Sequence, residues 1–243
     1  MRFRKEWRRG PWVGGNRMTV VADRRRPPSQ APQHLIVLNG DESPIIDSSP
    51  YNRTVTAVGS PAPSISTAQF QYGGSSISFP NTLGSYLLVS SNEFPAIGTG
   101  DFTFQTFVRQ TAFNNFSTLL EIGNHLNSSG IVFIAGNNGG TNLQIYSNGF
   151  FGSGAVPLNA MNHVAYVREQ GILSIYANGT RTSQTTFTNN LTSTGPITFG
   201  SSNPASVGAY NNTYRLAGWL DGACFTPSAL FSGPTLTIPT GPF

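Results

Sequence analysis

Charged residues and cysteine are scarce in this sequence. Charged side chains make up 10% of the 243 residues, against about 25% in typical globular domains. Cys224 has no second cysteine to pair with, which excludes an intrachain disulfide, and its neighbours in GWLDGACFT predict a small buried core residue. No apolar run approaches the roughly 20 residues of a membrane helix. The N-terminus lacks the apolar stretch of a secretory signal, so we expect a protein made in a cytoplasm and not exported by that route.

Recognisable catalytic patterns are also lacking. The sequence has no nucleophile–base pattern, phosphate-binding loop or zinc-ligand cluster. Its histidines, His34, His125 and His163, are scattered. Glu121 stands alone in LLEIGNH, so we interpret it as a surface or hydrogen-bonded acid in preference to a catalytic one.

Most of the positive charge lies in residues 1–33. This segment has nine basic residues against Glu6 and Asp23, a net charge of +7, whereas residues 34–243 have five arginines against eight acids, a net charge of −3. Residues 22–33, ADRRRPPSQAPQ, favour extended polyproline conformations and cannot pack a core. We predict a basic arm (1–33), a folded domain (34–232) and a proline-rich tail (233–243).

The arm has two interpretations. One is a solvated tail without a partner. The other, which we favour, is an anchoring arm that orders on an acidic surface, because tryptophan and arginine are enriched at the energetic centres of interfaces. The candidate docking residues are Arg2, Arg4, Trp7, Arg8, Arg9, Trp12, Arg24, Arg25 and Arg26.

From residue 34 onward the pattern predicts strands. DFTFQTFVR alternates, with Phe102, Phe104 and Val108 on one face and Phe107 on the other. Gly, Asn and Pro clusters separate the apolar runs, as in an antiparallel sandwich or barrel. We expect strands within 34–40, 53–59, 75–79, 85–90, 101–109, 117–123, 130–136, 142–147, 163–168, 172–177, 195–201 and 214–226.

A meander is predicted around NHVAYVREQGILSIYANGT, residues 162–180. Glu169-Gln170-Gly171 closes a hairpin, with Gly171 free to take positive φ. Asn178-Gly179 is a favoured type I′ turn that leads into TRTSQTTF.

This same stretch carries a family resemblance. LNAMNHVAYVREQGILSIYANGT resembles the pattern L-N-x-W-x-H-V-A-x-x-R-x-x-G-x-L-x-L-Y-x-N-G of concanavalin A-like, laminin-G-type domains. Three further segments resemble other parts of that pattern in the same order: residues 47–79, which end in FQYGGSSISF, then GTGDFTFQTFVRQ, and finally PITFGSS…RLAGWLDGACFTPSAL. The resemblance covers roughly residues 35–232 and implies an all-β, two-sheet antiparallel jelly-roll sandwich of twelve or more strands.

The sequence departs from the family pattern at three positions. Met161 stands where the family has Trp, Gly222 where it has the second acid of a closing pair, and Cys224 where it has Arg. If that acid pair contributes to a cation site, only Asp221 remains here. The resemblance gives His163 a packing role.

The resemblance also sets which chemistry to look for. Related glucanases need two carboxyl groups about 5 Å apart on one strand, as in E-x-D-x-x-E, and this spacing does not occur in the chain. We therefore expect that the protein is not an enzyme. We expect no cofactor, with calcium as a weak alternative at Asp41, Asp47 and Asp101, which we interpret first as solvated turn acids.

Glycan contact is the remaining binding function to weigh. Sugar sites in this fold use loop aromatics that stack on sugar rings. The candidates in YSNGFFGSG and SVGAYNNTY are Phe150, Phe151, Tyr210 and Tyr214. Packing at the rim or subunit contact explains these rings equally well.

The leading functional hypothesis is a non-enzymatic virion protein. Lone laminin-G-type domains of this kind resemble capsid decoration (cement), fibre or tail proteins of bacteriophages, which implies capsid or tail partners, a homo-oligomer in the particle and no membrane insertion. The arm would dock and the sandwich would face outward toward neighbouring subunits or host-surface glycans. The alternatives are a free carbohydrate-binding, lectin-like module and, ranked lowest, a nucleic-acid binder acting through the arm.

Overall fold

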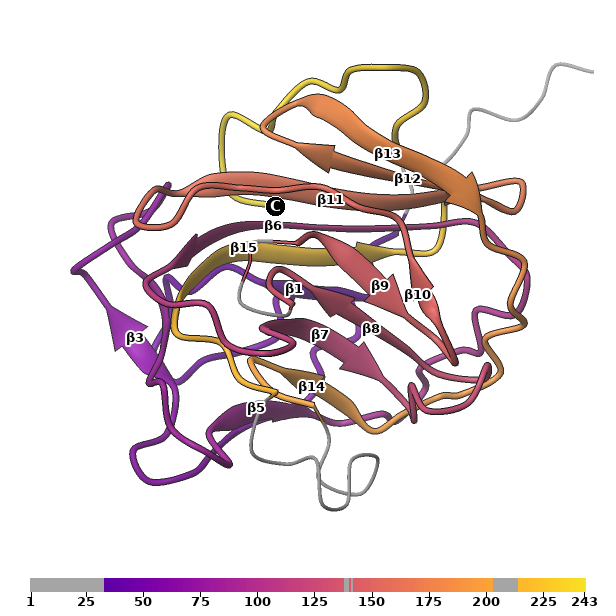
Figure 1. The fold of residues 1–243 in the computed structure, drawn as a ribbon. Coiled ribbons are helices and arrows are strands. Elements are labelled where there is room, and N and C mark those ends of the chain that lie inside the picture. The colour runs from indigo at the N-terminus through magenta and orange to yellow at the C-terminus, as the bar shows by residue number, and fades with distance from the viewer. Residues whose placement is uncertain (1–32, 138–139, 141, 203–213) are drawn as a thin grey trace, which may run out of the picture. The chain divides into compact units, whose positions relative to one another are not determined.

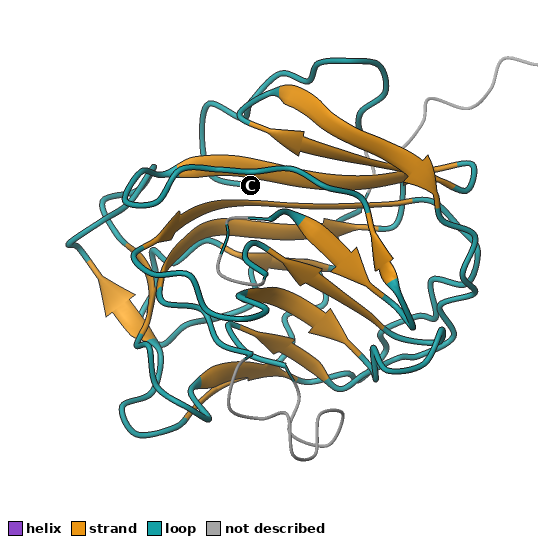
Figure 2. Ribbon diagram, viewed as in Figure 1, coloured by secondary structure: helices purple, strands orange, loops and turns teal. Residues whose placement is uncertain are grey.

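The computed structural model describes residues 33–137, 140, 142–202 and 214–243. The docking candidates of the predicted arm and Tyr210 lie outside these residues. Within them every named strand pairs antiparallel to its neighbours, and the strands form two sheets. The predicted all-β, two-sheet antiparallel sandwich is confirmed (Figures 1 and 2).

Sheet A contains, in spatial order, β13 (Thr180–Thr186), β12 (Ile172–Ala177), β11 (Asn162–Glu169), β6 (Phe102–Gln110), β15 (Gly218–Thr226), β4 (Ser76–Phe79) and β3 (Ser64–Ser66), with β1 (Ile36–Leu38) also paired to β15. Sheet B contains β10 (Phe150–Phe151), β9 (Gln144–Tyr146), β8 (Ile131–Ile134), β7 (Thr118–Ile122), β14 (Ile197–Phe199), β5 (Tyr86–Val89) and β2 (Val55–Val58). Neither β3 nor β10 was expected from the sequence. Both are too short, at three and two residues, to give an alternation signal.

The predicted meander is present as β11, β12 and β13. Gln170 and Gly171 turn the chain with φ of 50° and 78°, and Asn178 and Gly179 do so with φ of 49° and 83°. Two successive residues with positive φ are what a type I′ turn requires. The residues of these two turns therefore determine how the three strands follow one another in the sheet.

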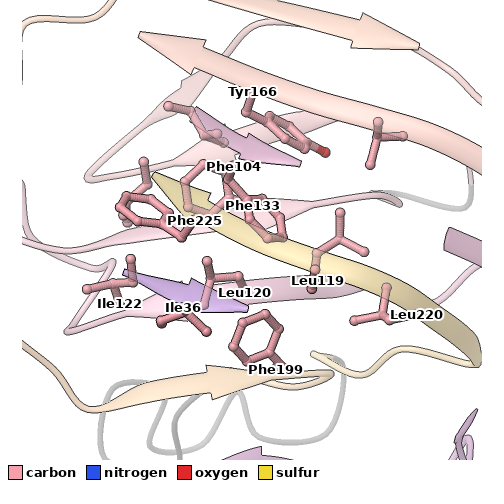
Figure 3. Packing of buried hydrophobic residues seen from close by; sticks show 14 of the residues in the cluster. Ile36, Phe104, Leu119, Leu120, Ile122, Phe133, Tyr166, Phe199, Leu220 and Phe225 are labelled. Carbon is pink, nitrogen blue, oxygen red and sulfur yellow. The ribbon is translucent and has the colours of Figure 1, made fainter. Parts of the chain in front are cut away.

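The core between the sheets is rich in phenylalanine (Figure 3). Phe104 and Phe133 come from opposite sheets with ring centroids 4.7 Å apart. As the alternation predicts, Phe102, Phe104 and Val108 belong to this core, whereas Phe107 lies on the outer face of sheet A against Tyr72 and His163. Cys224 is also buried, as expected.

A buried arginine closes one end of the sandwich. Arg168 donates to the carbonyls of Gly100, Asn189 and Gly98 at 2.7, 2.9 and 2.8 Å. Burial lowers the pKa of Arg168 to about 10, although the negative charge of Asp101 acts to raise it. The guanidinium therefore stays charged at neutral pH, and its donors join three loop carbonyls, of which that of Gly98 also accepts from the Leu191 N–H at 2.9 Å.

Candidate functional site

Aromatic side chains lie on the outer face of sheet B in the part formed by β7 to β10. On β8, Val132 and Ile134 alternate with core residues and so point to this outer face, yet both are fully buried. Phe150 pairs in register with Tyr146, Tyr146 with Val132, and Val132 with Glu121. Because directly paired residues share a face of a sheet, a row of side chains crosses β10, β9, β8 and β7 on that face. Figure 1 shows these four strands in this order.

Three rings from separate segments stack beside this row. Phe116 lies between Phe150, with centroids 5.6 Å apart and planes 4° apart, and Tyr214, with centroids 4.6 Å apart and planes 11° apart. Tyr146 and Phe150 form a T-shaped contact with their ring centroids 4.8 Å apart. We call Phe116, Tyr146, Phe150 and Tyr214 the aromatic platform.

The backbone of the platform is constrained. Phe116 has φ of 54°, a left-handed conformation that costs a non-glycine residue roughly 1–3 kcal/mol. Asn148, in the β9–β10 turn, has φ of 53°, and its N–H donates to the His125 carbonyl at 2.9 Å. The turn that carries Phe150 is thereby tied to the loop between β7 and β8.

A buried pair of side chains, Glu121 and His125, packs against the aromatic platform. The Glu121 Oε1 lies 2.6 Å from the His125 Nδ1, and both side chains are buried. The His125 ring contacts Tyr146 at 5.4 Å and Tyr214 at 5.5 Å. Of the two non-catalytic roles expected for Glu121, surface acid or hydrogen-bonded acid, the structure shows the second, because the side chain is buried and bonded to His125. The His125 ring in turn joins the two tyrosines.

The platform is open to solvent at one end. Phe150 is 45% exposed, whereas Tyr214 is 7% exposed. Two further apolar side chains in the adjoining loops, Phe113 and Leu126, are 39% and 42% exposed. A flat exposed ring with rigid aromatic backing can present its face to an apolar ligand surface.

The glycan candidates from the sequence have different places. Phe150 and Tyr214 are brought together, with Phe116 between them. Phe151 packs against Phe187, a core residue, at 4.9 Å. Phe116 and His125 were not predicted from the sequence as platform residues, since only the order of strands in sheet B brings their loops to Phe150.

The three calcium candidates lie apart and have protein partners. Asp47 is buried and accepts from the backbone N–H groups of Val37, Ser49 and Arg53 at 2.9, 3.0 and 3.1 Å. Asp101 accepts from the Gln170 N–H at 2.8 Å. Within the described residues, no group of three or more His, Cys, Asp or Glu side chains could hold a metal ion.

Asp41 lies near Asp221. Desolvation by burial raises the pKa of Asp221, and the charge of Asp41 raises it further. Hydrogen bonds from the N–H groups of Tyr72 and Gln71 act in the opposite direction and lower this pKa. Those N–H groups donate to the Asp221 Oδ2 at 2.9 and 2.5 Å. The remaining acid of the family's closing pair thus holds the loop that carries Tyr72.

The family model of the concanavalin A-like lectin/glucanases superfamily matches residues 81–230. No curated protein matches the chain by sequence. The part of the chain that the structure describes has no helix that could cross a membrane.

Several solved structures share the fold. Domain 4 of AbnA, an extracellular arabinanase from Geobacillus stearothermophilus, in complex with arabinotriose, has a TM-score of 0.61 at 14% identity over 83% of this chain and 96% of that one. The binding domain of Paraclostridial Mosquitocidal Protein 1 has a TM-score of 0.59 at 15% identity over 82% of this chain and 50% of that one. The binding domain of botulinum neurotoxin DC, in complex with SialylT, has a TM-score of 0.57 at 15% identity over 82% and 48%. The chain spans about half the length of the two toxin domains.

Proposed function

The chain belongs to the concanavalin A-like lectin/glucanases superfamily, and from this premise we propose that it is a non-catalytic carbohydrate-binding module whose ligand stacks on the aromatic platform. The observation that carries the proposal is the exposed Phe150 ring, backed in parallel by Phe116 at 5.6 Å. A sugar ring has an apolar C–H face that matches such a surface.

Rigid backing matters because binding has an ordering cost. Phe116 stacks on Phe150 and Tyr214, and Tyr146 and His125 hold the neighbouring rings. The platform is therefore ordered before a ligand arrives, so little conformational freedom is lost on binding.

Two of the similar structures support a carbohydrate ligand. The arabinanase domain was solved with arabinotriose and the neurotoxin binding domain with SialylT. The identities of 14% and 15% carry only the fold to this chain, so the choice of sugar has to come from measurement.

The contacts of the acidic side chains support a non-catalytic role. Glu121 bonds His125 in the interior, and Asp221 bonds two backbone N–H groups. Retaining hydrolysis needs a second carboxyl group about 5 Å from the first, across an open site. Asp221 and Asp41 are near each other, but the Asp221 side chain is buried and committed to the loop at Tyr72.

A glycan array with the full chain tests the proposal. Wild-type protein should bind a subset of glycans, and Phe150→Ala should lose that binding. Phe70→Ala is the matched control, because Phe70 is 47% exposed, close to the 45% of Phe150, and belongs to the loop beside Asp221 on sheet A. An array without selective binding, or equal binding by both variants, would reject the proposal.

The charge distribution of the sequence favours a second candidate role, that of a virion structural protein. The arm has a net charge of +7 and the remaining residues −3, which suits docking through residues 1–33 on an acidic capsid or tail surface, with the sandwich displayed outward. Deleting residues 1–30 should leave a folded domain that no longer joins the particle. Normal incorporation of the truncated protein would exclude this role and leave the glycan proposal intact.

A further inference from the structure

The last residues of the chain form a strap over the outer face of sheet A. We call residues 227–243 the C-terminal strap; Figure 1 shows it in yellow, passing along β12 and β13. Every residue of the strap is partly or largely exposed. It contains no regular strand, and a single isolated bridge, Thr180 to Thr235, joins it to β13.

The strap covers a patch of mainly apolar side chains on the outer face of sheet A. Ala165, Val167 and Tyr176 on this outer face are buried, and they pack against Ala229, Phe231 and Leu236 of the strap. An apolar sheet face covered by a single, half-exposed layer is a region of low local stability. Of the three covering residues, Leu236 lies in the last ten residues of the chain, so release of those residues would uncover apolar surface that favours a new cover.

Backbone groups make most of the polar contacts of the distal strap, residues 234–243. The Pro234 carbonyl accepts from the Arg181 N–H, and the Leu236 N–H donates to the Gly179 carbonyl, both at 2.9 Å. Tyr72 Oη donates to the Pro239 carbonyl, and Asn39 Nδ2 donates to the Phe243 carbonyl at 3.2 Å. None of these bonds requires that strap and sheet belong to one molecule.

The side-chain contacts, by contrast, depend on the amino-acid sequence of the strap. A Cβ at Gly222 would lie 3.0 Å from the Phe243 ring, so the missing side chain there makes room for that ring. A Cβ at Gly179 would lie 3.4 Å from Ile238. The surface therefore matches the strap sequence, and another copy of this chain supplies the same sequence.

A hinge precedes the distal strap. Ser232 and Gly233 are both exposed, Gly233 has φ of 84°, and nothing lies within 4 Å of the position of its Cβ. The Gly233 carbonyl accepts from the Tyr176 Oη at 2.9 Å. Rotation at these two residues would release this one hydrogen bond and swing the distal strap away without moving β15.

We propose that the distal strap docks in trans on the outer face of sheet A of a second copy of this chain, so that copies are linked by exchanged straps. The exchanged state keeps each backbone bond and each side-chain contact that the distal strap makes in the closed state. Its extra cost is the association of two chains, so it becomes populated at high local concentration. This interface lies on sheet A and is independent of the aromatic platform on sheet B.

Two variants of the full chain, each with one added cysteine, test the exchange. Thr180 and Thr235 are exposed bridge partners, and cross-strand partners have Cβ atoms close enough for a disulfide. Thr180→Cys and isotopically heavy Thr235→Cys are mixed at high concentration, oxidised and analysed by mass spectrometry. The native Cys224 is fully buried and does not compete. The control mixture replaces Thr180→Cys by Thr56→Cys, which is exposed on β2 of sheet B.

The proposal predicts that the mixed light–heavy disulfide is at least tenfold enriched for the Thr180/Thr235 mixture over the control mixture. The double variant Thr180→Cys/Thr235→Cys, oxidised when dilute, should close an intrachain disulfide and then stay monomeric at high concentration. Equal yields from the two mixtures, with a normal intrachain disulfide in the double variant, would overturn exchange. Failure of the intrachain disulfide to form would overturn the strap geometry on which the proposal depends.

Discussion

The rings of Phe116 and Phe150 lie parallel, with their planes 4° apart and their centroids 5.6 Å apart, although Phe116 comes from the loop before β7 and Phe150 from strand β10 of sheet B. The Phe116 backbone takes a φ of 54° at this position. A strained residue persists only where its surroundings hold it, and such positions cluster at ligand sites. The pair is the structural basis of the proposed glycan site.

Removing the backing ring should weaken binding even though Phe150 remains. Phe116→Ala should lower glycan affinity about tenfold, which is about 1.4 kcal/mol, because Phe150 would have to be ordered by the ligand. Isothermal titration with a glycan that the array selects measures the change. Phe70→Ala should bind like wild type, and an unchanged Kd for Phe116→Ala would show that the stack does not support the ligand.

The Glu121–His125 pair should stabilise the folded state. Glu121→Gln keeps the size of the side chain but weakens the acceptor 2.6 Å from the His125 Nδ1, and we expect a loss of about 1–3 kcal/mol in the free energy of unfolding. Urea denaturation measures it. Glu169→Gln, on an exposed glutamate at the end of β11, should change stability by less than about 0.5 kcal/mol. Equal effects of both substitutions would contradict the buried pair.

His163 should make stability depend on pH. Burial lowers its pKa from 6.5 to about 4. Between these two pH values the His163 ring therefore binds a proton in the unfolded chain but not in the folded chain. Stability is then complete above pH 6.5 and falls as the pH drops toward 4, by a total of about 3 kcal/mol.

Urea titrations of wild type and His163→Gln across that window measure this dependence. The variant should show a flatter stability profile between pH 6.5 and 4, since glutamine does not titrate. Parallel profiles would mean that His163 is already protonated in the folded protein.

Arg168 should contribute strongly to stability. Arg168→Met keeps an apolar side chain between Phe102 and Phe187 but removes the three hydrogen bonds that the guanidinium donates to loop carbonyls. Of these carbonyls, that of Gly98 keeps a further donor, the Leu191 N–H. We expect a loss of about 3 kcal/mol or more in chemical denaturation. Arg181→Met, on the edge strand β13, should cost less than about 1 kcal/mol, and a similar loss for both would contradict the role of the buried guanidinium.

Glycan binding should not require a metal. We propose this because Asp41, Asp47 and Asp101 lie apart and Asp47 is committed to backbone N–H groups. Treatment with EDTA should leave the melting temperature and the glycan Kd unchanged, and added calcium should not raise either. A calcium-dependent rise in melting temperature would restore calcium as a cofactor.

The sequence predicted the fold better than the site, for a physical reason. The turns at Gln170-Gly171 and Asn178-Gly179 specify their own φ values, so β11 to β13 follow from local chemistry. The alternation of Phe102, Phe104 and Val108 likewise marks the core face of β6.

The platform could not be derived in this way. Phe116, Phe150 and Tyr214 meet only because sheet B places the neighbouring strands in one order and register. Phe151, adjacent to Phe150, faces Phe187 instead, because successive residues of a strand point to opposite sides. The C-terminal strap has no regular strand, so its position also depends on long-range contacts.

Saturation-transfer NMR with a glycan selected by the array tests ring stacking most directly. Irradiation of the aromatic protons should transfer saturation to the C–H protons on one face of the sugar in the wild type and in Phe70→Ala. The transfer should be lost in Phe150→Ala, with the chain still folded. If Phe150→Ala transfers saturation to the sugar as strongly as the wild type does, the ligand lies elsewhere and the platform is a packing feature.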